Sequence, residues 1–353
     1  MATPASFSLI LGLIIFSFSI TCILIVPFIN LLYKLRLRRK KEAPKNGKIP
    51  LFDKLHDSKA GTPIGGGLLI IAVVSVLFLV IFPFSSHMGV LIRSAYSFGT
   101  EVFIILFTFL TFGLLGLIDD VVKIFGKGRA GTKPLGLVYG LSRKQKLVIQ
   151  WILALVVSYI MCQHLGIKIL HVPLVSKTLN LGWWYVPFSA LVIVSFSNAF
   201  NITDGLDGLA CGLLTICLVA FGVLAAGNLD TPLATFIALW LGALMAFLYF
   251  NVWPARVFLG DAGALSFGAT LAVIGLLTGS VFALLIIGGI FIIEVSSSAF
   301  QILGWKYLKR PLLPLAPLHN TFLSLGWEEP KIVFRAYLAG IMLAIFGLWL
   351  ATI

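Results

Sequence analysis

Charged side chains are scarce in this chain of 353 residues: only 11% are Asp, Glu, Lys or Arg, whereas 59% are hydrophobic. A soluble protein carries about a quarter charged residues, so the composition excludes a soluble globular fold and also intrinsic disorder. Cysteines are few, and they lie inside apolar runs without metal-ligand spacing, which excludes a disulfide scaffold and indicates packing. The four are Cys22, Cys162, Cys211 and Cys217.

Residues 1–33 carry no charged side chain. A cleaved signal peptide has basic residues before its apolar stretch, whereas the first basic residue here, Lys34, follows it. We therefore expect a retained first span with its N-terminus outside. Glycine-rich nucleotide motifs of the Walker and dinucleotide types are also missing, so any bound nucleotide would be a substrate.

Ten apolar stretches are long enough to be transmembrane helices, which need about 20 residues. The sequence therefore predicts an all-α, polytopic integral membrane protein with about ten transmembrane helices. The ninth stretch contains Glu294, and only Gly279 and Ser280 separate it from the eighth. The stretches are 7–33, 63–83, 99–118, 147–164, 182–200, 209–226, 232–250, 264–278, 280–304 and 333–352.

The basic residues orient these spans. A net charge of +13 would suggest nucleic acid for a soluble protein, but here all but Arg93, Lys168 and Lys177 of the 26 basic residues fall on one side of the membrane. The positive-inside rule makes that side cytoplasmic and both termini extracytoplasmic, and no nucleic-acid partner is expected. The loops on that side are 34–62, 119–146, 198–208, 251–263 and 305–335.

We interpret residues 1–353 as a single transmembrane domain with three notable cytoplasmic segments. The basic loop 34–62 has a charge that suits anionic lipid headgroups. The loop 119–146 opens with an Asp-Asp pair, and the loop 305–335 is rich in proline and contains a histidine.

Two adjacent carboxylates, Asp119 and Asp120, stand at the predicted end of the third span. Carboxylates at a helix C-terminus oppose the helix dipole and repel each other. A divalent cation with phosphates would offset both effects, and Lys123 is placed to pair with them or with a phosphate. An ordinary solvated helix end is the alternative for this pair taken alone.

Four polar side chains recur every third residue at the end of the fifth span, with glycines between them; they are Asn198, Asn201, Asp204 and Asp207. Residues with this spacing share a helix face, and the glycines let a ligand approach the backbone. Capping by Asn and Asp accounts for one or two of the four, so we favour a functional site.

Two further groups lie on the same side. Asp261 stands between Gly260 and Gly263 at the start of the eighth span, after Asn251 and Arg256. Asp is a good N-cap, so capping is the alternative for Asp261. In the last loop, three prolines predict an extended arm, and we expect His319 at its tip to be functional rather than a core histidine.

Together these groups place five aspartates at one membrane face. Mg²⁺ binds one or two carboxylates together with water and phosphate oxygens. A carboxylate-rich site with Lys and Arg nearby suits phosphoryl transfer to or from a lipid phosphate. We therefore expect Mg²⁺ as the cofactor and contact with membrane lipid. Direct attack by the lipid phosphate and a covalent Asp intermediate both fit the sequence, and we favour direct attack because a lipid phosphate is already a competent nucleophile.

Several stretches, in order along the chain, resemble the motifs of one family. They are Lys59-Ala-Gly-Thr-Pro-Ile-Gly-Gly-Gly, Gly116-Leu-Ile-Asp-Asp-Val-Val-Lys123, 198–210, Phe258-Leu-Gly-Asp-Ala-Gly263, 294–301, Ala316-Pro-Leu-His319 and the tail from Gly326 to Arg335. The chain resembles the polyprenyl-phosphate N-acetylhexosamine-1-phosphate transferases, and most closely their phospho-N-acetylmuramoyl-pentapeptide transferase (MraY) branch. It departs from that pattern where Asn320 and Thr321 replace two of three successive histidines, and at Ile64-Gly65.

The resemblance implies an enzyme of the bacterial inner membrane with ten spans and a cytoplasmic active site. It implies transfer of phospho-N-acetylmuramoyl-pentapeptide from its UDP conjugate to undecaprenyl phosphate, with release of UMP and formation of the first lipid-linked peptidoglycan precursor. By motif position the implied catalytic residues are Asp119, Asp120, Lys123, Asp261 and His319, and the implied Mg²⁺ ligands are Asp261, Asp119 and Asp120. The implied substrate-binding residues are Lys59, Asn198, Asn201, Asp204, Asp207, Asn251, Phe258 and Gln301.

Three other functions stay open at this point. A GlcNAc-1-phosphate transferase for another surface polymer is compatible with Asn320 and Thr321. A secondary transporter would place carboxylates near the midplane, where the sequence predicts only Glu294. A non-catalytic scaffold would tolerate loss of the aspartates. The sequence also leaves open whether the protein forms a homodimer.

Overall fold

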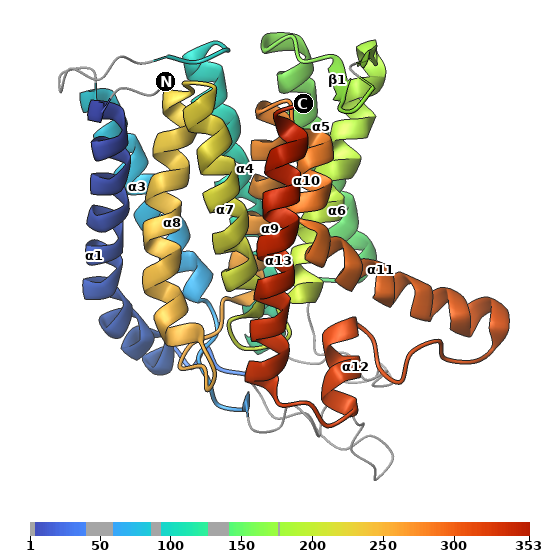
Figure 1. Ribbon diagram of the computed structural model, residues 1–353. Coiled ribbons are helices and arrows are strands. Elements are labelled where there is room, and N and C mark those ends of the chain that lie inside the picture. Colours follow the sequence, from blue (N-terminus) through green and yellow to red (C-terminus); the bar gives the residue numbers. More distant parts are fainter. Residues whose placement is uncertain (1–3, 40–58, 86–92, 126–140, 176) are drawn as a thin grey trace.

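The computed structural model describes residues 4–39, 59–85, 93–125, 141–175 and 177–353. Its main feature is a bundle of helices that run up and down beside one another, with both ends of the chain at the same end of the bundle (Figure 1). The helices of this bundle are α1 (Pro4–Lys34), α3 (Gly66–Ser85), α4 (Phe98–Phe125), α5 (Arg143–His164), α6 (Tyr185–Thr203), α7 (Leu209–Gly227), α8 (Thr231–Asn251), α9 (Gly260–Leu277), α10 (Val281–Ile287) and α13 (Glu329–Ala351).

Eight helices in the described part of the chain are long and apolar enough to cross a membrane. They are α1, α4, α5, α6 together with the short helix η2 (Gly182–Trp184), α7, α8, α9 and α13. Helix α3 is apolar but shorter. The prediction of a polytopic, mainly helical membrane protein is therefore confirmed.

The predicted ninth span is not one continuous helix. It divides into α10 and α11 (Gly289–Leu303), and the two are bent by 74°. A Cβ at Gly288 would lie 2.6 Å from Phe196 of α6, and one at Gly289 would lie 3.0 Å from Leu343 of α13. The side chains of Phe196 and Leu343 therefore pack against the backbone at the break. Helix α11 leaves the bundle sideways (Figure 1) and continues into the π-helical turn η3 (Gly304–Leu308).

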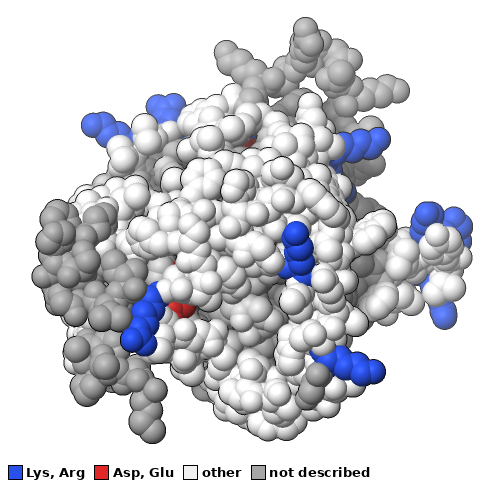
Figure 2. Space-filling view, turned by 90° about the horizontal axis from the view of Figure 1, so that it is seen from above, with Lys and Arg blue, Asp and Glu red and all other residues white. Residues whose placement is uncertain are grey.

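A small hairpin interrupts the helical pattern. Strands β1 (Ile169–Val172) and β2 (Lys177–Asn180) pair in antiparallel fashion, with Ile169 opposite Asn180. The hairpin lies at the end of the bundle that carries the two termini (Figure 1). Seen from that end, the molecule is mostly uncharged, with scattered basic side chains (Figure 2). The all-α prediction thus holds for the bundle but missed this hairpin.

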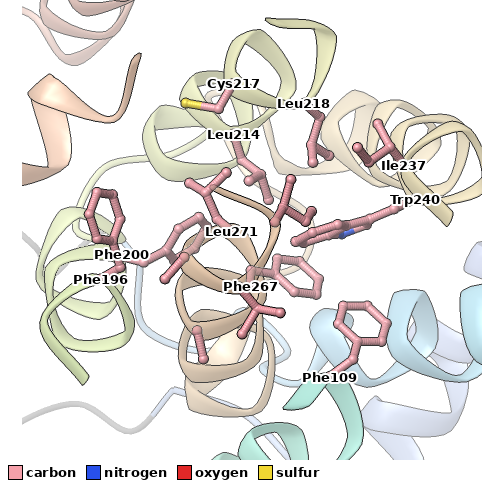
Figure 3. Packing of buried hydrophobic residues seen from close by; sticks show 14 of the residues in the cluster. Phe109, Phe196, Phe200, Leu214, Cys217, Leu218, Ile237, Trp240, Phe267 and Leu271 are labelled. Carbon is pink, nitrogen blue, oxygen red and sulfur yellow. The ribbon is translucent and has the colours of Figure 1, made fainter. Parts of the chain in front are cut away.

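Helix α9 forms the centre of the core. Its Phe267 lies 5.8 Å, between ring centroids, from Phe109 of α4 and 5.1 Å from Trp240 of α8. Phe200 of α6 adds an edge-to-face contact with the same ring at 6.1 Å (Figure 3). The four cysteines are free, as expected, and three of them are buried.

Glycines bring the start of α9 against two other helices. A Cβ at Gly116 of α4 would lie 2.1 Å from the backbone oxygen of Asp261, and one at Gly67 of α3 would lie 2.3 Å from the Cα of Gly263. Only glycine allows backbones to approach this closely. Because Asp119 and Asp120 follow Gly116 by one turn, this contact places them beside Asp261.

The helix ends differ from the predicted loop limits. Helix α4 continues to Phe125, so Asp119 and Asp120 lie inside its last two turns, and residues 126–140 of the predicted loop fall outside the described residues. The same is true of residues 40–58 in the basic loop. The predicted loop 305–335 contains a short helix, α12 (Leu318–Ser324), and the start of α13.

Candidate active site

Four helix ends meet at the end of the bundle opposite the termini: the ends of α4 and α6 and the beginnings of α5 and α9 (Figure 1). Asp119 supplies the most buried carboxylate of this site. Its Oδ2 lies 2.9 Å from the ammonium groups of both Lys123 and Lys146, and its Oδ1 accepts a hydrogen bond from the backbone N–H of Leu141 at 2.9 Å. Two cations and one N–H therefore offset this charge.

Asp261 faces the same two cations. Its Oδ2 lies 2.6 Å from the Nζ atoms of both Lys123 and Lys146, while Oδ1 accepts from the amide of Asn201 at 3.1 Å. The N-cap of α9 is Leu259, and Asp261 lies in the first helical turn. The capping alternative is thus wrong for Asp261, whose carboxylate is used for contacts with other helices.

Asp120 belongs to the same cluster through backbone contacts. Its Oδ2 accepts from the N–H of Ala262 at 3.1 Å. A Cβ at Gly260 would lie 2.8 Å from that oxygen, and the φ of Gly260 is +80°, so a glycine is required there. The three predicted catalytic aspartates are therefore brought together, as the sequence suggested.

Lys146 and Gln150 of α5 are site residues that the sequence interpretation missed. The amide of Asn198 on α6 donates to the Gln150 side chain at 2.8 Å, and Lys146 bridges Asp119 and Asp261. Both lie on one face of α5, four residues apart, after the N-cap Ser142. That spacing, in a helix whose start is basic, was the signal available in the sequence.

Lys59 lies in a second cluster, where it is only 7% exposed. Its ammonium group is 2.7 Å from Asp207 and 2.5 Å from Glu329 at the start of α13. The other carboxylate oxygen of Asp207 accepts from the N–H of Ala255 at 2.8 Å. Glu329 was not among the predicted site residues. The cluster joins three distant parts of the chain beside the carboxylate site.

Asp204 lies between the two clusters, at the C-terminal cap of α6. Burial and the nearby charge of Asp261 raise its pKa to about 7, against the opposing effect of Lys59. This carboxyl group is therefore harder to ionise than an ordinary solvated aspartate.

Asn251 and Phe258 shape the turn that leads into α9. The buried amide of Asn251 donates to the carbonyl of Val257 at 2.9 Å. The carbonyl of Phe258 accepts from the N–H groups of Gly65 and Gly66, so this turn is fixed to the start of α3. Both residues thus border the site through its backbone framework.

His319 is not at an exposed tip, which corrects the prediction. It lies in α12 and is 1% exposed, and its Nδ1 is 3.0 Å from Glu294 of α11. The reason is that Glu294 and Ser297 take up the N–H groups of His319 and Leu318, which draws α12 onto α11.

Gln301 serves the proline-rich segment. Its amide accepts from the N–H groups of Leu312 and Leu313 and donates to the carbonyl of Leu313. Unlike Asn201, it makes these contacts with a loop rather than with a carboxylate. The structure thus assigns it a role in holding residues 311–315 against α11.

A divalent cation would find two carboxylates aimed at one position. Within the described residues, no group of three or more His, Cys, Asp or Glu side chains is arranged as a protein-only metal cage. Asp119 and Asp261, however, contact the same two ammonium groups at 2.6–2.9 Å, so both carboxylates face the same pair of cations. Two carboxylates with room for phosphate oxygens suit Mg²⁺, which seldom uses a closed protein cage.

Comparisons with known proteins identify the family that this chain resembles. The profile of the family described as glycosyl transferase family 4 matches residues 102–279. The phospho-N-acetylmuramoyl-pentapeptide-transferase of Geobacillus sp. (strain WCH70) is 34% identical over 96% of each chain. The protein of the same name from Bacillus velezensis is 35% identical over 98% of this chain and 97% of its own, and that from Bacillus subtilis (strain 168) is 33% identical over 97% of each.

Proposed function

The chain belongs to the phospho-N-acetylmuramoyl-pentapeptide transferases of glycosyl transferase family 4, and we propose that it performs their reaction. It transfers phospho-N-acetylmuramoyl-pentapeptide from the UDP conjugate to undecaprenyl phosphate and releases UMP. The names of relatives that match nearly the whole chain do not favour another sugar donor.

One observation carries the proposal: Asp119 and Asp261, from different helices, share the ammonium groups of Lys123 and Lys146. Both substrates bring phosphate to this site, and two anions repel each other. A set of cations and carboxylates held by four helix ends positions both anions without reorganisation during the reaction. Phosphoryl transfer depends mainly on such positioning and charge stabilisation.

We propose Mg²⁺ as the cofactor, held by Asp261 and Asp119 with Asp120 adjacent. The contacts of these carboxylates with the same two ammonium groups support this assignment. When bound, the ion would neutralise the donor diphosphate and stabilise the departing UMP. Lys123 and Lys146 then remain available to contact substrate phosphates, and Asn201 orients Asp261 through its amide.

Proton transfer falls to the aspartate pair of α4. Asp119 accepts from two ammonium groups and one backbone N–H, which leaves it little capacity for a proton. Asp120 accepts from the N–H of Ala262 and is the better candidate to take the proton of the lipid phosphate before direct attack. On the donor side we place Lys59, Asn198, Asn201, Asp204, Asp207, Asn251, Phe258, Gln301 and His319.

We propose ten spans, counting α3 and the bent pair α10–α11, with both termini extracytoplasmic. The chain direction alternates along the bundle, and both termini lie opposite the carboxylate site (Figure 1). The segregation of basic residues supports a cytoplasmic site in the inner membrane. Association into a homodimer stays a prediction, which sedimentation of the detergent-solubilised protein would test.

The proposal is tested by measuring UMP release from purified protein with undecaprenyl phosphate. We expect release from UDP-N-acetylmuramoyl-pentapeptide, little from UDP-GlcNAc, and loss of activity with EDTA that added Mg²⁺ restores. Asp261→Asn should lower kcat by about 100-fold or more, while Glu328→Gln, at an exposed helix cap without a side-chain cap bond, should not. Preference for UDP-GlcNAc, or full activity in EDTA, would overturn the proposal.

A further inference from the structure

Glu294 is a buried carboxylate with an unusual set of partners. It is 5% exposed, on the helix that leaves the bundle. Burying an ionised carboxylate is costly unless hydrogen bonds compensate. Its Oε2 lies 3.0 Å from the ring Nδ1 of His319 and also accepts from the backbone N–H of His319 at 3.3 Å. One oxygen thus fixes both the ring and the backbone of a single residue.

This contact sets the tautomer of His319. An ionised carboxylate can only accept hydrogen bonds, so Nδ1 carries a proton and Nε2 of the neutral ring keeps its lone pair. Nε2 is buried and has no hydrogen-bond partner among the described residues. An unpaired buried polar atom costs free energy. A bound ligand that donates a hydrogen bond to Nε2 would remove this cost.

The ring edge that carries the free nitrogen lies against the polar segment at the end of α6. A Cβ at Gly205 would lie 2.3 Å from Nε2, so the ring edge borders the backbone between Asp204 and Asp207. The carbonyl of Gly205 also accepts from Lys59 at 3.4 Å. The imidazole therefore adjoins the polar segment at the end of α6, where both neighbouring clusters meet.

We propose that Glu294 is a positioning residue for the nucleotide-sugar: it holds His319 with Nδ1 protonated and presents Nε2 as an acceptor to a hydroxyl or N–H group of the donor. This inference rests on the proposed function. The UDP-sugar carries several such groups, whereas the polyprenyl chain of the acceptor carries none. Loss of Glu294 should therefore affect the donor and not the lipid.

Two variants separate this role from packing. Glu294→Leu keeps the volume but removes every acceptor, and we expect the KM for the donor to rise about tenfold or more, because a hydrogen bond to a charged group is lost. The KM for undecaprenyl phosphate should stay within about twofold. Glu294→Gln keeps an acceptor oxygen and should restore the donor KM to within about threefold of the wild type.

A matched control is Ser298→Ala on the same helix, whose hydroxyl is buried without a hydrogen-bond partner; it should leave both KM values unchanged. The double variant Glu294→Leu with His319→Asn should be no worse than His319→Asn alone, because Glu294 acts through His319. If Glu294→Leu fails to fold, Glu294→Asp, which withdraws the carboxylate by one methylene, takes its place with the same donor-specific loss expected.

Equal losses for donor and acceptor, additive effects in the double variant, or no rescue by glutamine would overturn the inference. These outcomes are distinct from failure of the proposed function. If the proposed function is wrong, the wild type itself will release no UMP from the pentapeptide donor, whatever the variants do.

Discussion

Two ammonium groups, those of Lys123 and Lys146, each contact carboxylates from two different helices. Lys123 is four residues from Asp119, but Lys146 is 115 positions from Asp261. A short contact of the first kind follows from helical spacing. The second depends on how α5 and α9 pack, so the sequence could indicate a basic helix start but not its partner.

Lys146→Gln is expected to lower kcat/KM by about 100-fold or more, because the carboxylate cluster and the substrate phosphates both lose a positioned cation. Lys144→Gln is the matched control, since Lys144 is exposed in the same helical turn. Steady-state kinetics of UMP release would measure both variants. Activity of Lys146→Gln equal to that of Lys144→Gln would contradict the role assigned to this ammonium group.

At the scale of elements, the contact between α4 and α9 decides whether the site exists. Gly116 lets the backbone of Asp261 approach, and its sequence neighbours Asp119 and Asp120 then face Asp261. The sequence motifs identified the aspartates as site residues, and the glycines belong to the same motifs. The sequence could not predict their contact, because the pairing of two apolar helices leaves no periodic signal in either one.

Gly116→Ala tests this contact. The added methyl would lie 2.1 Å from backbone, which cannot move aside as a side-chain end can. We expect an overpacking cost of about 1–3 kcal/mol and, because the aspartates separate, a fall in kcat. Gly99→Ala in the same helix has open space around its Cβ and serves as control. The measurements are the melting temperature and the UMP release of both variants. A Gly116→Ala protein as stable and active as the control would show that this contact is not important.

The break between α10 and α11 could not be predicted from the sequence, which indicated a single span. The stretch 280–304 carries no charged side chain apart from Glu294, and glycine is common in membrane helices. At the bend, Phe196 and Leu343 from other helices lie close to the backbone of Gly288 and Gly289. Glu294 was the one local sign of it, because a carboxylate in a membrane helix needs a partner, and the bend brings that partner, His319, into reach.

Across the whole molecule, the two ends differ in charge and in chemistry. The end with the termini is mostly uncharged (Figure 2), and the carboxylate and lysine clusters lie at the other. The sequence predicted this polarity well, because the positive-inside rule uses loop composition alone. The terminal end nevertheless holds two buried acidic residues, Glu101 and Asp230, which are 0% and 5% exposed.

This pair makes stability depend on pH in a defined direction. Burial raises the pKa of Asp230, because a buried carboxyl group is harder to ionise than a solvated one. A carboxyl whose pKa is higher in the folded state than in the unfolded state stabilises the fold at low pH. That contribution is lost as pH rises from the unfolded value, about 4, through the folded value. The melting temperature should therefore fall as the pH is raised above the unfolded-state value.

Asp230→Asn should flatten this dependence, because asparagine keeps the N-cap contact with the N–H of Leu233 and has no titrating proton. Glu328→Gln, which removes an exposed carboxylate at the other end, should leave the slope as in the wild type. The measurement is the melting temperature of the solubilised protein from pH 5 to 8. A wild-type melting temperature that rises over this range, or an Asp230→Asn slope equal to that of Glu328→Gln, would show that Asp230 does not take up a proton on folding.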